Sequence, residues 1–511
     1  MSTRQLDFDS CYAAVSARDS RFDGRFYTAV TSTGIYCRPV CPARTPARKN
    51  VRFYRHAAGA EAAGFRPCRR CRPELSPGAP GWDVRADLVG RALRLIGDGE
   101  ADDHGVGGLA RRLNVTERHL HRLFVAELGT GPLAVARTRR LLLAKQLLTE
   151  TRLSITDVAF AAGFGSVRQF NAAMKESYGF APGDLRKANG PLSGGASPHL
   201  FPHGLTLRLH YRPPYDAAPM FRYLAARAIP GTESVTLPEP PEQGAGGPDG
   251  RSPGEATYLR AVPGGWITLV PMADHIRLTV RTDDTRRLAR FVARCRRLLD
   301  LDADPEPIAS ALGATSLAPL VAERPGLRVP GAFDGFELAV RAVVGQQISV
   351  AGARTLLGRI AARAGTVVDV AAPDRDGRET AAVTTLFPTA DRLAGADLTG
   401  IGLTDRRVAT LRALAEAVAE GRIDLDGAED VPETTAKLLE IPGIGPWTAS
   451  YVALRALGDP DAWPGGDLVL KKTMQCLGIP AEHAERWRPW RAYAALHLWS
   501  SSAPPAAACA I

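Results

Sequence analysis

Four of the eight cysteines lie within 35 residues of one another, and this cluster constrains how the first part of the chain folds. They follow the pattern C-x3-C, then 26 intervening residues, then C-x2-C: Cys37, Cys41, Cys68 and Cys71. Two such pairs can place four thiolates tetrahedrally around one Zn²⁺ ion. In a cytosolic chain, clustered cysteines favour a metal over disulfides. The spacing therefore predicts a small module built around one zinc ion.

The residues around these cysteines leave the role of the metal open. Spacing alone favours a purely structural zinc site. Four arginines flank the ligands, so the site could also lie against a phosphate backbone: Arg38, Arg69, Arg70 and Arg72. A zinc-bound thiolate stays deprotonated at neutral pH and can be alkylated. The pattern is therefore compatible with either a structural or a reactive zinc centre.

The length of 511 residues is too great for one hydrophobic core, and a prior of about 150 residues per domain predicts three or four domains. The 45% apolar and 23% charged residues are ordinary for a soluble globular protein. No apolar run approaches the roughly 18 residues of a membrane helix. The start, Met1 to Asp7, lacks the apolar core of a secretory signal. We expect a cytoplasmic protein that does not bind membranes.

Charge is distributed unevenly along the chain, whose net charge is +10. Residues 1–190 carry 30 Lys and Arg against 18 Asp and Glu, whereas residues 191–511 carry 34 against 36. Phosphate contacts by Lys and Arg release counterions and dominate nonspecific affinity for nucleic acids. The imbalance predicts that the first part binds a polyanion and that the rest binds through local features.

Composition and periodicity divide the chain into the parts of a multidomain α+β protein. We expect a four-cysteine α/β module at 1–80, an all-α domain at 82–188, a small α+β domain with an antiparallel sheet at 200–320 and a mainly helical domain at 321–500. The Gly, Ser and Pro-rich segment 189–199 is typical of a linker, and we expect the Ala and Pro-rich tail, 501–511, to be frayed.

Two helix–turn–helix patterns recur between residues 82 and 188. In the first, Asn114 and Val115 turn the chain and Thr116 can cap the next helix. In the second, Ser154 can cap the first helix, Gly163 makes the turn and Ser166 can cap the next helix. The second helix of each pattern carries exposed polar side chains that are candidate DNA contacts: Arg118, Arg122, Arg168 and Asn171. The alternative is that each pattern is an ordinary helical hairpin without a role in DNA binding. The matching caps and the exposed polar residues argue against this alternative.

A glycine-containing turn near the end of the chain, Ile441 to Trp447, predicts a second kind of DNA contact. Gly443 and Gly445 leave backbone N–H groups open to close approach, and the helix that follows has an N-terminus that attracts a phosphate. Asp467, twenty residues after the tryptophan, is a lone carboxylate in an apolar stretch. A phosphate clamp beside one carboxylate indicates chemistry on DNA.

Asp467 admits two roles that do not exclude each other. It can cap the helix that starts at Leu468. It can also stabilise positive charge on a sugar, because breaking an N-glycosidic bond builds charge near the anomeric carbon and a nearby carboxylate offsets it and can orient a water. The nearby glycine turn favours the catalytic role.

The cysteine segment resembles a known family once its flanks are included. The segments Phe26 to Val30, Thr33 to Pro39 and Gly64 to Cys71 resemble the N-terminal domain of the Ada methylphosphotriester-repair regulators, over nearly all of residues 5–75. The resemblance implies that Cys37 both ligates zinc and accepts a methyl group from a DNA phosphotriester. It also implies that this self-methylation tightens operator binding.

Residues 83–188 resemble the AraC-type pair of helix–turn–helix units that follows in Ada, which would read adjacent major-groove segments. This resemblance ends at about residue 188, because no Pro-Cys-His-Arg stretch of the second Ada repair domain follows. Leu205 to Ser500 instead resembles the AlkA-type 3-methyladenine DNA glycosylases, through segments such as Tyr211 to Asp216, Leu224 to Ala228 and Ile441 to Lys471. The turn is then a helix–hairpin–helix, and Asp467 takes the position of the catalytic aspartate.

Trp447 bears on the type of glycosylase that this resemblance implies. Bifunctional relatives in the helix–hairpin–helix superfamily place a lysine at this point that forms a Schiff base, and tryptophan cannot replace it.

The aromatic positions around the family's base pocket, where rings stack on a flipped base, are matched by Trp447, Tyr451 and Trp499. Gln347 stands where the AlkA relative has a leucine wedge. The four-cysteine cluster of endonuclease III relatives is missing, so we expect no iron–sulfur cluster.

The sequence therefore predicts a DNA alkylation-repair fusion. A zinc phosphotriester sensor with methyltransferase activity at Cys37 and an AraC-type regulator precede a monofunctional glycosylase of the DNA-3-methyladenine glycosylase II type. We expect a monomer that acts on double-stranded DNA near the nucleoid, with RNA polymerase as a further partner. The alternative is a transcription regulator with a structural zinc site and a glycosylase region that binds damage without releasing a base.

Overall fold

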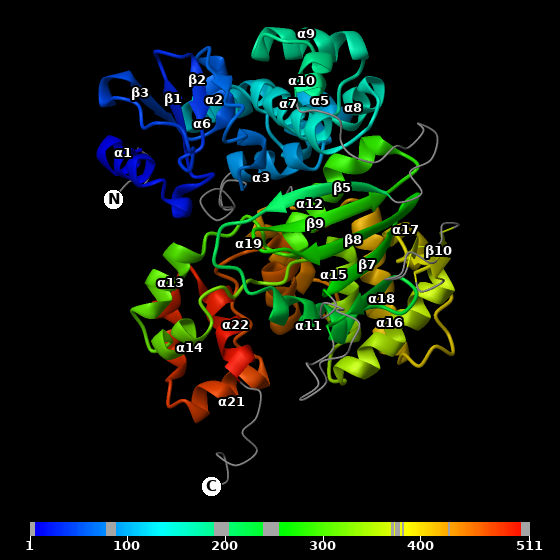
Figure 1. Cartoon of the computed structure of the whole chain (residues 1–511). Helices are drawn as coiled ribbons and strands as arrows, with labels where there is room; N and C mark the ends of the chain where they lie inside the picture. Colours follow the sequence, from blue (N-terminus) through cyan, green and yellow to red (C-terminus); the bar gives the residue numbers. More distant parts are fainter. Residues whose placement is uncertain are drawn as a thin grey trace, which may run out of the picture. The chain divides into compact units, whose positions relative to one another are not determined.

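The computed structural model describes residues 6–77, 88–188, 204–238, 255–368, 372–373, 379–380, 383–427 and 430–501 (Figure 1). Contacts among them group the chain into two compact units. The first contains residues 1–213, 284–296 and 301–304, and the second contains residues 214–283, 297–300 and 305–511. The expected linker at 189–199 and the expected tail beyond residue 501 lie outside the described residues.

The first unit begins with a small α/β module around a four-stranded sheet in the order β3-β1-β2-β4. Strand β1 is antiparallel to β2 and β3, and β4 runs parallel to β2. Tyr36 and Phe65 are buried on one side of the sheet, and Phe26 is buried beside α1. The elements are α1 (Phe8–Ala17), β1 (Tyr27–Val30), β2 (Ile35–Cys37), β3 (Val51–Tyr54), α2 (Ala57–Ala62), β4 (Arg66–Pro67) and the 3₁₀ turn η3 (Pro73–Leu75).

A helical region follows in the same unit, and its helices begin at the caps that the sequence predicts. The side chains of Thr116, Ser154 and Ser166 accept hydrogen bonds from backbone amides in the first turns of their helices. Asn114 adopts a left-handed conformation, with φ 55°, that suits the turn. The helices are α3 (Leu88–Gly97), α4 (Glu100–Asp103), α5 (Gly105–Arg112), α6 (Glu117–Leu128), α7 (Pro132–Glu150), α8 (Ile155–Ala161), α9 (Val167–Tyr178) and α10 (Pro182–Ala188).

Helix α7 is the longest of these helices, and it lies against most of the unit. It contacts α3, α6 of the first helix–turn–helix pattern, α8 of the second, and both α2 and η3 of the four-cysteine module (Figure 1). Strand β5 (Leu205–His210) also contacts it. Because α7 has buried residues on several faces, it serves as the centre of this unit's core.

The second unit opens with the expected antiparallel sheet, in which consecutive strands pair in the order β9-β8-β7-β6. Helix α11 (Ala217–Arg227) packs against β6 and β7. Alternate residues of β9 are buried, as expected for a strand with one face on the core. The strands are β6 (Glu233–Thr236), β7 (Thr257–Val262), β8 (Gly265–Pro271) and β9 (His275–Arg281).

The rest of the second unit is mainly helical, which confirms the predicted fold class. Nearly every residue of α15 (Gly335–Val344) is buried, and this helix contacts α16, α18 and α20. The remaining helices are α12 (Leu288–Leu298), α13 (Pro305–Gly313), α14 (Ala318–Glu323), α16 (Val350–Ala364), α17 (Ala390–Ala394), α18 (Asp405–Ala419), α19 (Val431–Leu439), α20 (Pro446–Val452), α21 (Leu468–Cys476) and α22 (Arg491–Ser501). Of these, α12 is divided between the two units.

Two short strand pairs complete the fold: β10 (Thr366–Val367) with β13 (Thr385–Leu386), and β11 (Ala372–Pro373) with β12 (Glu379–Thr380). None of the helices within the described residues is both long and apolar enough to cross a bilayer.

Candidate functional site

The four clustered cysteines converge as their spacing predicts. The Sγ atoms of Cys37, Cys41, Cys68 and Cys71 all lie within 4.8 Å of one another. A tetrahedral zinc with Zn–S bonds of about 2.3 Å requires sulfur atoms about 3.8 Å apart. The two cysteines of the second pair are buried and those of the first are partly exposed. The arrangement fits one Zn²⁺ ion, and a bound zinc would hold the sulfurs as thiolates.

Arg38 packs inward beside this cluster, rather than outward as a phosphate contact would. Its backbone N–H donates to Cys71 Sγ at 3.3 Å, and its Nη1 donates to the Cys71 carbonyl oxygen at 3.1 Å. The guanidinium also pairs with Asp23. Burial tends to lower the pKa of Arg38, but Asp23 raises it overall, so the side chain stays charged.

Only two of the four arginines that flank the cysteines remain exposed. Arg69 and Arg70 face solvent, and the Arg69 guanidinium lies 4.4 Å from the ring centre of Phe180. Arg72, in contrast, forms an ion pair with Glu74 at 2.9 Å. Arg69 and Arg70 are therefore the flanking arginines that this structure leaves open to a phosphate backbone.

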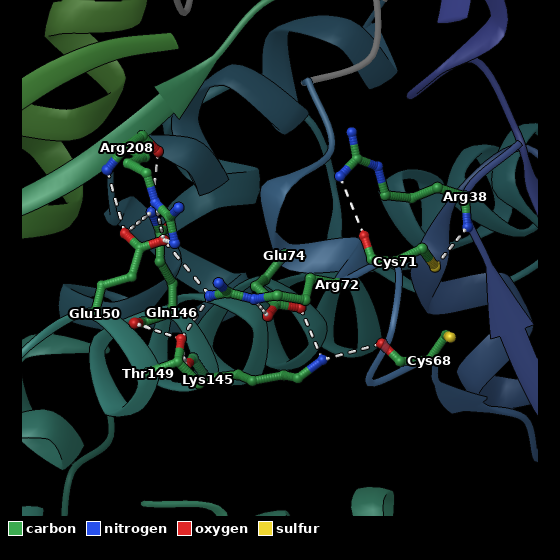
Figure 2. Close-up of polar contacts among 10 residues, drawn as sticks. All are labelled: Arg38, Cys68, Cys71, Arg72, Glu74, Lys145, Gln146, Thr149, Glu150 and Arg208. Carbon is green, nitrogen blue, oxygen red and sulfur yellow. Dashed lines mark hydrogen bonds and ion pairs between the residues drawn. The ribbon is translucent and has the colours of Figure 1, made fainter. Parts of the chain in front are cut away.

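A chain of ion pairs joins the second cysteine pair to α7 (Figure 2). Lys145 Nζ lies 2.8 Å from Glu74 Oε2 and donates to the Cys68 carbonyl oxygen at 3.4 Å. The side chains of Lys145 and Glu74 are 3% and 0% exposed. Arg72 donates to Thr149 Oγ1 at 2.6 Å, and Glu150 pairs with Arg208 at 3.1 Å. The cysteine segment is thereby attached to the helix between the two helix–turn–helix patterns.

The candidate DNA contacts of the helical region lie where the sequence predicts exposed positions. Arg118 and Arg122 are exposed on α6, and Arg168 and Asn171 are exposed on α9. Arg122 Nη2 lies 3.1 Å from His119 Nδ1. Leu120, Phe124 and Phe170 are fully buried on the opposite faces of these helices. Each helix therefore has a polar, exposed face and an apolar, buried face.

The glycine turn in the second unit joins α19 to α20 as a hairpin. Gly443 has φ 95°, and a Cβ atom there would lie 2.2 Å from Thr410 Oγ1, so the position requires glycine. Gly445 has φ −98° and no such obstruction. Within the described residues, the amides of these two glycines donate no hydrogen bond. They remain available to an approaching phosphate.

Two residues that the sequence analysis did not single out support this hairpin. Gln346 Nε2 donates to the Gly443 carbonyl oxygen at 3.0 Å and to Thr448 Oγ1 at 2.9 Å. Arg407 Nη2 donates to the Gln346 carbonyl oxygen at 2.5 Å. The neighbouring Gln347 is exposed, with φ 57°. The side-chain amide of Gln346 thus connects the hairpin to the segment that carries Gln347.

Asp467 is both a helix cap and the acceptor of two tryptophan N–H groups. Its Oδ1 accepts from the amides of Val469 and Leu470 at 2.9 and 3.0 Å, which caps α21. Trp499 Nε1 donates to Oδ1 at 3.1 Å, and Trp447 Nε1 donates to Oδ2 at 2.9 Å. Four N–H groups therefore hold the carboxylate in one orientation.

A cavity of about 550 Å³ opens beside this carboxylate. Trp447, Tyr451, Trp499 and Asp467 all line it. The rings of Trp447 and Tyr451 are stacked, with centroids 5.3 Å apart and planes 15° apart, and Trp499 meets Tyr451 edge-on at 6.5 Å. The predicted aromatic residues thus share one wall with the predicted aspartate. Gln347 does not line the cavity.

Comparisons with known proteins match three parts of the chain to families. Residues 10–74 match the metal binding domain of Ada, residues 109–188 a helix-turn-helix domain and residues 206–334 the AlkA N-terminal domain. A probable bifunctional transcriptional activator/DNA repair enzyme AlkA from Mycobacterium tuberculosis is 43% identical over 98% of this chain and 97% of its own length. The chain belongs to this bifunctional AlkA family.

Two relatives from Escherichia coli correspond to the two parts of this AlkA-family chain. DNA-3-methyladenine glycosylase 2 is 36% identical over 57% of the chain and 95% of its own length. The bifunctional transcriptional activator/DNA repair enzyme Ada is 36% identical over 35% of the chain and 49% of its own length. The chain therefore joins an Ada-like part to an AlkA-like part, as the sequence predicts.

Tyr223 also lines the cavity, although no AlkA-family motif in the sequence marks it. Tyr223 on α11 lies with its hydroxyl oxygen 3.1 Å from that of Tyr451. The guanidinium carbons of Arg227 and Arg455 lie 4.0 and 4.4 Å from the centre of the Tyr223 ring. No local pattern marks Tyr223, because α11 meets α20 only after folding. Its position just before Leu224 to Ala228, a segment that carries the AlkA resemblance, is the one sequence signal for it.

Proposed function

We propose that the second unit hydrolyses the N-glycosidic bond of alkylated purines such as 3-methyladenine in double-stranded DNA. The hairpin around Gly443 grips the phosphate backbone, and the flipped base enters the cavity beside Trp447 and Tyr451. Water attacks the anomeric carbon, the base leaves, and an abasic site remains. The observation that carries this proposal is the Asp467 carboxylate at the cavity wall, oriented by four N–H donors.

Asp467 acts here by electrostatic stabilisation. As the glycosidic bond breaks, positive charge develops on the sugar, and a fixed carboxylate lowers the energy of that state without having to reorganise. Trp447 and Trp499 fix the carboxylate through their N–H groups and offer apolar faces to the base. Trp447 cannot form a Schiff base, so strand cleavage does not accompany base release.

The first test is release of 3-methyladenine from alkylated duplex DNA by the full chain. We expect Asp467→Asn to lower the single-turnover rate by at least about 100-fold, because removing one electrostatic group from a preorganised site costs that much. DNA affinity, measured in parallel by fluorescence anisotropy, should change little. Undiminished release by the variant would refute the catalytic role of Asp467.

We further propose that the four-cysteine site senses DNA phosphate methylation. A zinc ion held by the four thiolates would keep the Cys37 sulfur deprotonated and nucleophilic. The Cys37 sulfur attacks the methyl carbon of a phosphotriester; an S–C bond forms as the methyl C–O bond breaks, and a phosphodiester is released. Partial exposure separates Cys37 and Cys41 from the buried Cys68 and Cys71, and the resemblance to the Ada domain selects Cys37 of these two. The exposed residues of α6 and α9 then bind promoter DNA, through which the protein acts as a transcriptional activator.

Peptide mapping by mass spectrometry tests this sensor without substituting a zinc ligand. After incubation with methylphosphotriester DNA, we expect a mass increase of one methyl group on the peptide containing Cys37. Incubation with unmodified DNA is the control. Methylation confined to another cysteine would contradict the assignment. A protein that binds promoter DNA but neither accepts methyl groups nor releases bases would instead be a regulator with two silent repair regions.

A further inference from the structure

Two tyrosine hydroxyls meet at the wall of the glycosylase cavity, and the proposed mechanism uses neither of them. Tyr223 comes from α11, beside the antiparallel sheet, and Tyr451 from α20, behind the hairpin. Their oxygen atoms are 3.1 Å apart, and both residues line the cavity. Stacking of Tyr451 on Trp447 requires only the ring. The hydroxyl pair is therefore free to serve another purpose.

Two cations make the members of this pair unequal. Arg227 and Arg455 lie 4.0 and 4.4 Å from the centre of the Tyr223 ring, whereas Arg455 is 5.6 Å from that of Tyr451. Burial tends to raise the pKa of Tyr223, but Arg455 and Arg227 lower it to about 8. Burial, and then repulsion from Tyr223, raise the pKa of Tyr451 to about 12. Tyr223 is the stronger hydrogen-bond donor.

The surroundings bury Arg455 and fix the backbone that carries Arg227. Arg455 is 3% exposed and sits in a π-helical turn, Ala453–Leu457, directly after α20. Arg341 Nη1 donates to the Arg227 carbonyl oxygen at 2.8 Å. The other charged groups that line the cavity from elements packed on α11 are Arg354 of α16, Glu233 of β6 and Arg260 of β7. Glu233 and Arg260 neutralise each other at 2.7 Å.

This inequality favours Tyr223 as the donor in the hydrogen bond between the hydroxyls, whose geometry allows either direction. A hydroxyl has one proton to donate and can accept two hydrogen bonds. With Tyr223 as the donor to the Tyr451 oxygen, the Tyr451 proton is available to another acceptor. Because Tyr451 borders the cavity, an acceptor on a bound base can receive that proton.

We propose that the Tyr451 hydroxyl, held by Tyr223, donates a hydrogen bond to a flipped base and so favours bases with a carbonyl oxygen at that edge over bases with an amino group there. Alkylated guanine carries the O6 acceptor, whereas alkylated adenine carries an N6 amino donor. A cavity that offers a donor discriminates against a base that cannot accept it. Tyr451 is the specificity residue and Tyr223 is its positioning residue. The inference rests on the proposed glycosylase activity.

The test compares the release of 7-methylguanine and 3-methyladenine from alkylated duplex DNA by the full chain under single-turnover conditions. We expect Tyr451→Phe to lower the ratio of 7-methylguanine to 3-methyladenine release by about fivefold to tenfold, as loss of one buried hydrogen bond predicts. The ring and its stacking are retained. Tyr215→Phe is the matched control. The Tyr215 hydroxyl donates to the Leu299 carbonyl oxygen at 3.2 Å, and Tyr215 does not line the cavity.

A pH profile tests the positioning role of Tyr223 separately. Above pH 8 a Tyr223 phenolate would accept the Tyr451 proton, so the wild-type release ratio should fall between pH 7 and pH 9. In Tyr223→Phe the ratio should not change with pH in this range. A purely structural hydroxyl pair would not produce this difference.

The outcomes separate this inference from the proposed activity. If the wild-type chain releases neither base, the glycosylase proposal fails and the inference fails with it. If the wild type releases both bases and Tyr451→Phe slows both equally, or changes neither, the inference alone is wrong. A ratio with the same pH dependence in wild type and Tyr223→Phe would overturn the role of Tyr223.

Discussion

Asp467 shows how one side chain can serve the fold and the proposed chemistry at once. Its Oδ1 atom caps α21, and this fixes the carboxylate to the start of a helix. The two tryptophan N–H groups then hold it from the cavity side. A group whose orientation is set before the substrate binds does not have to reorganise during the reaction. The capping role and the proposed catalytic role therefore support each other.

Removing one tryptophan N–H tests this orientation. Trp499→Phe keeps an aromatic ring but loses the donor to Asp467, so we expect base release to slow about tenfold because catalysis is sensitive to small displacements of a reacting group. Trp463→Phe is the control, since Trp463 packs edge-on against Trp487 and does not line the cavity. Equal rates for wild type and Trp499→Phe would show that this N–H has no part in orienting the carboxylate.

Helix α7 joins the four-cysteine module to the two helix–turn–helix patterns by a buried ion pair. Lys145 on α7 pairs with Glu74, which follows the second cysteine pair, and both side chains are buried. Lys145 also binds the carbonyl oxygen of a cysteine ligand, Cys68. Movement of η3 away from α7 would leave two buried charges unpaired, so these elements are held together.

Breaking this pair from one side should be costly. We expect Glu74→Gln to lower the free energy of unfolding of the first unit by about 3–5 kcal/mol, as removal of one partner of a buried ion pair does. Urea unfolding followed by circular dichroism measures this. Glu176→Gln is the control, because Glu176 pairs with Arg137 at 2.5 Å on the surface, where water screens the interaction. Equal loss of stability in both variants would argue against a special role for the buried pair.

The two proposed activities belong to separate compact units. The four cysteines all lie in the first, whereas Asp467, the hairpin and every residue that lines the cavity lie in the second. Each set of reacting groups is therefore complete within its own unit. Neither set borrows a side chain from the other.

Zinc removal should accordingly affect the two activities differently. We expect a chelator of high affinity to destabilise the first unit and abolish methyl transfer, because metal binding to four thiolates contributes directly to folding free energy. Release of 3-methyladenine should continue at its original rate. Zinc content, methyl transfer and base release are measured on the same sample, and restoring zinc under reducing conditions is the control. Loss of base release on chelation would mean that the second unit depends on the zinc module.

The local patterns in the sequence determined much of this protein. Cysteine spacing predicted the thiolate cluster, and Thr116, Ser154 and Ser166 marked helix starts, because a cap acts within its own turn of chain. Gly443 marked the hairpin for the same reason, since its φ of 95° is a local requirement.

Only the tertiary structure decided which distant residues meet. The sequence places Tyr223 and Tyr451 228 positions apart, yet their hydroxyls meet at the wall of the cavity. The sequence leaves open a contact of Arg38 and Arg72 with a phosphate, but in the structure each is turned inward by a carboxylate, Asp23 or Glu74. A charge pattern indicates that arginines are present, but not which partner each one finds. Partner choice depends on the packing of elements that are remote in sequence, because burial makes an unpaired charge too costly to leave.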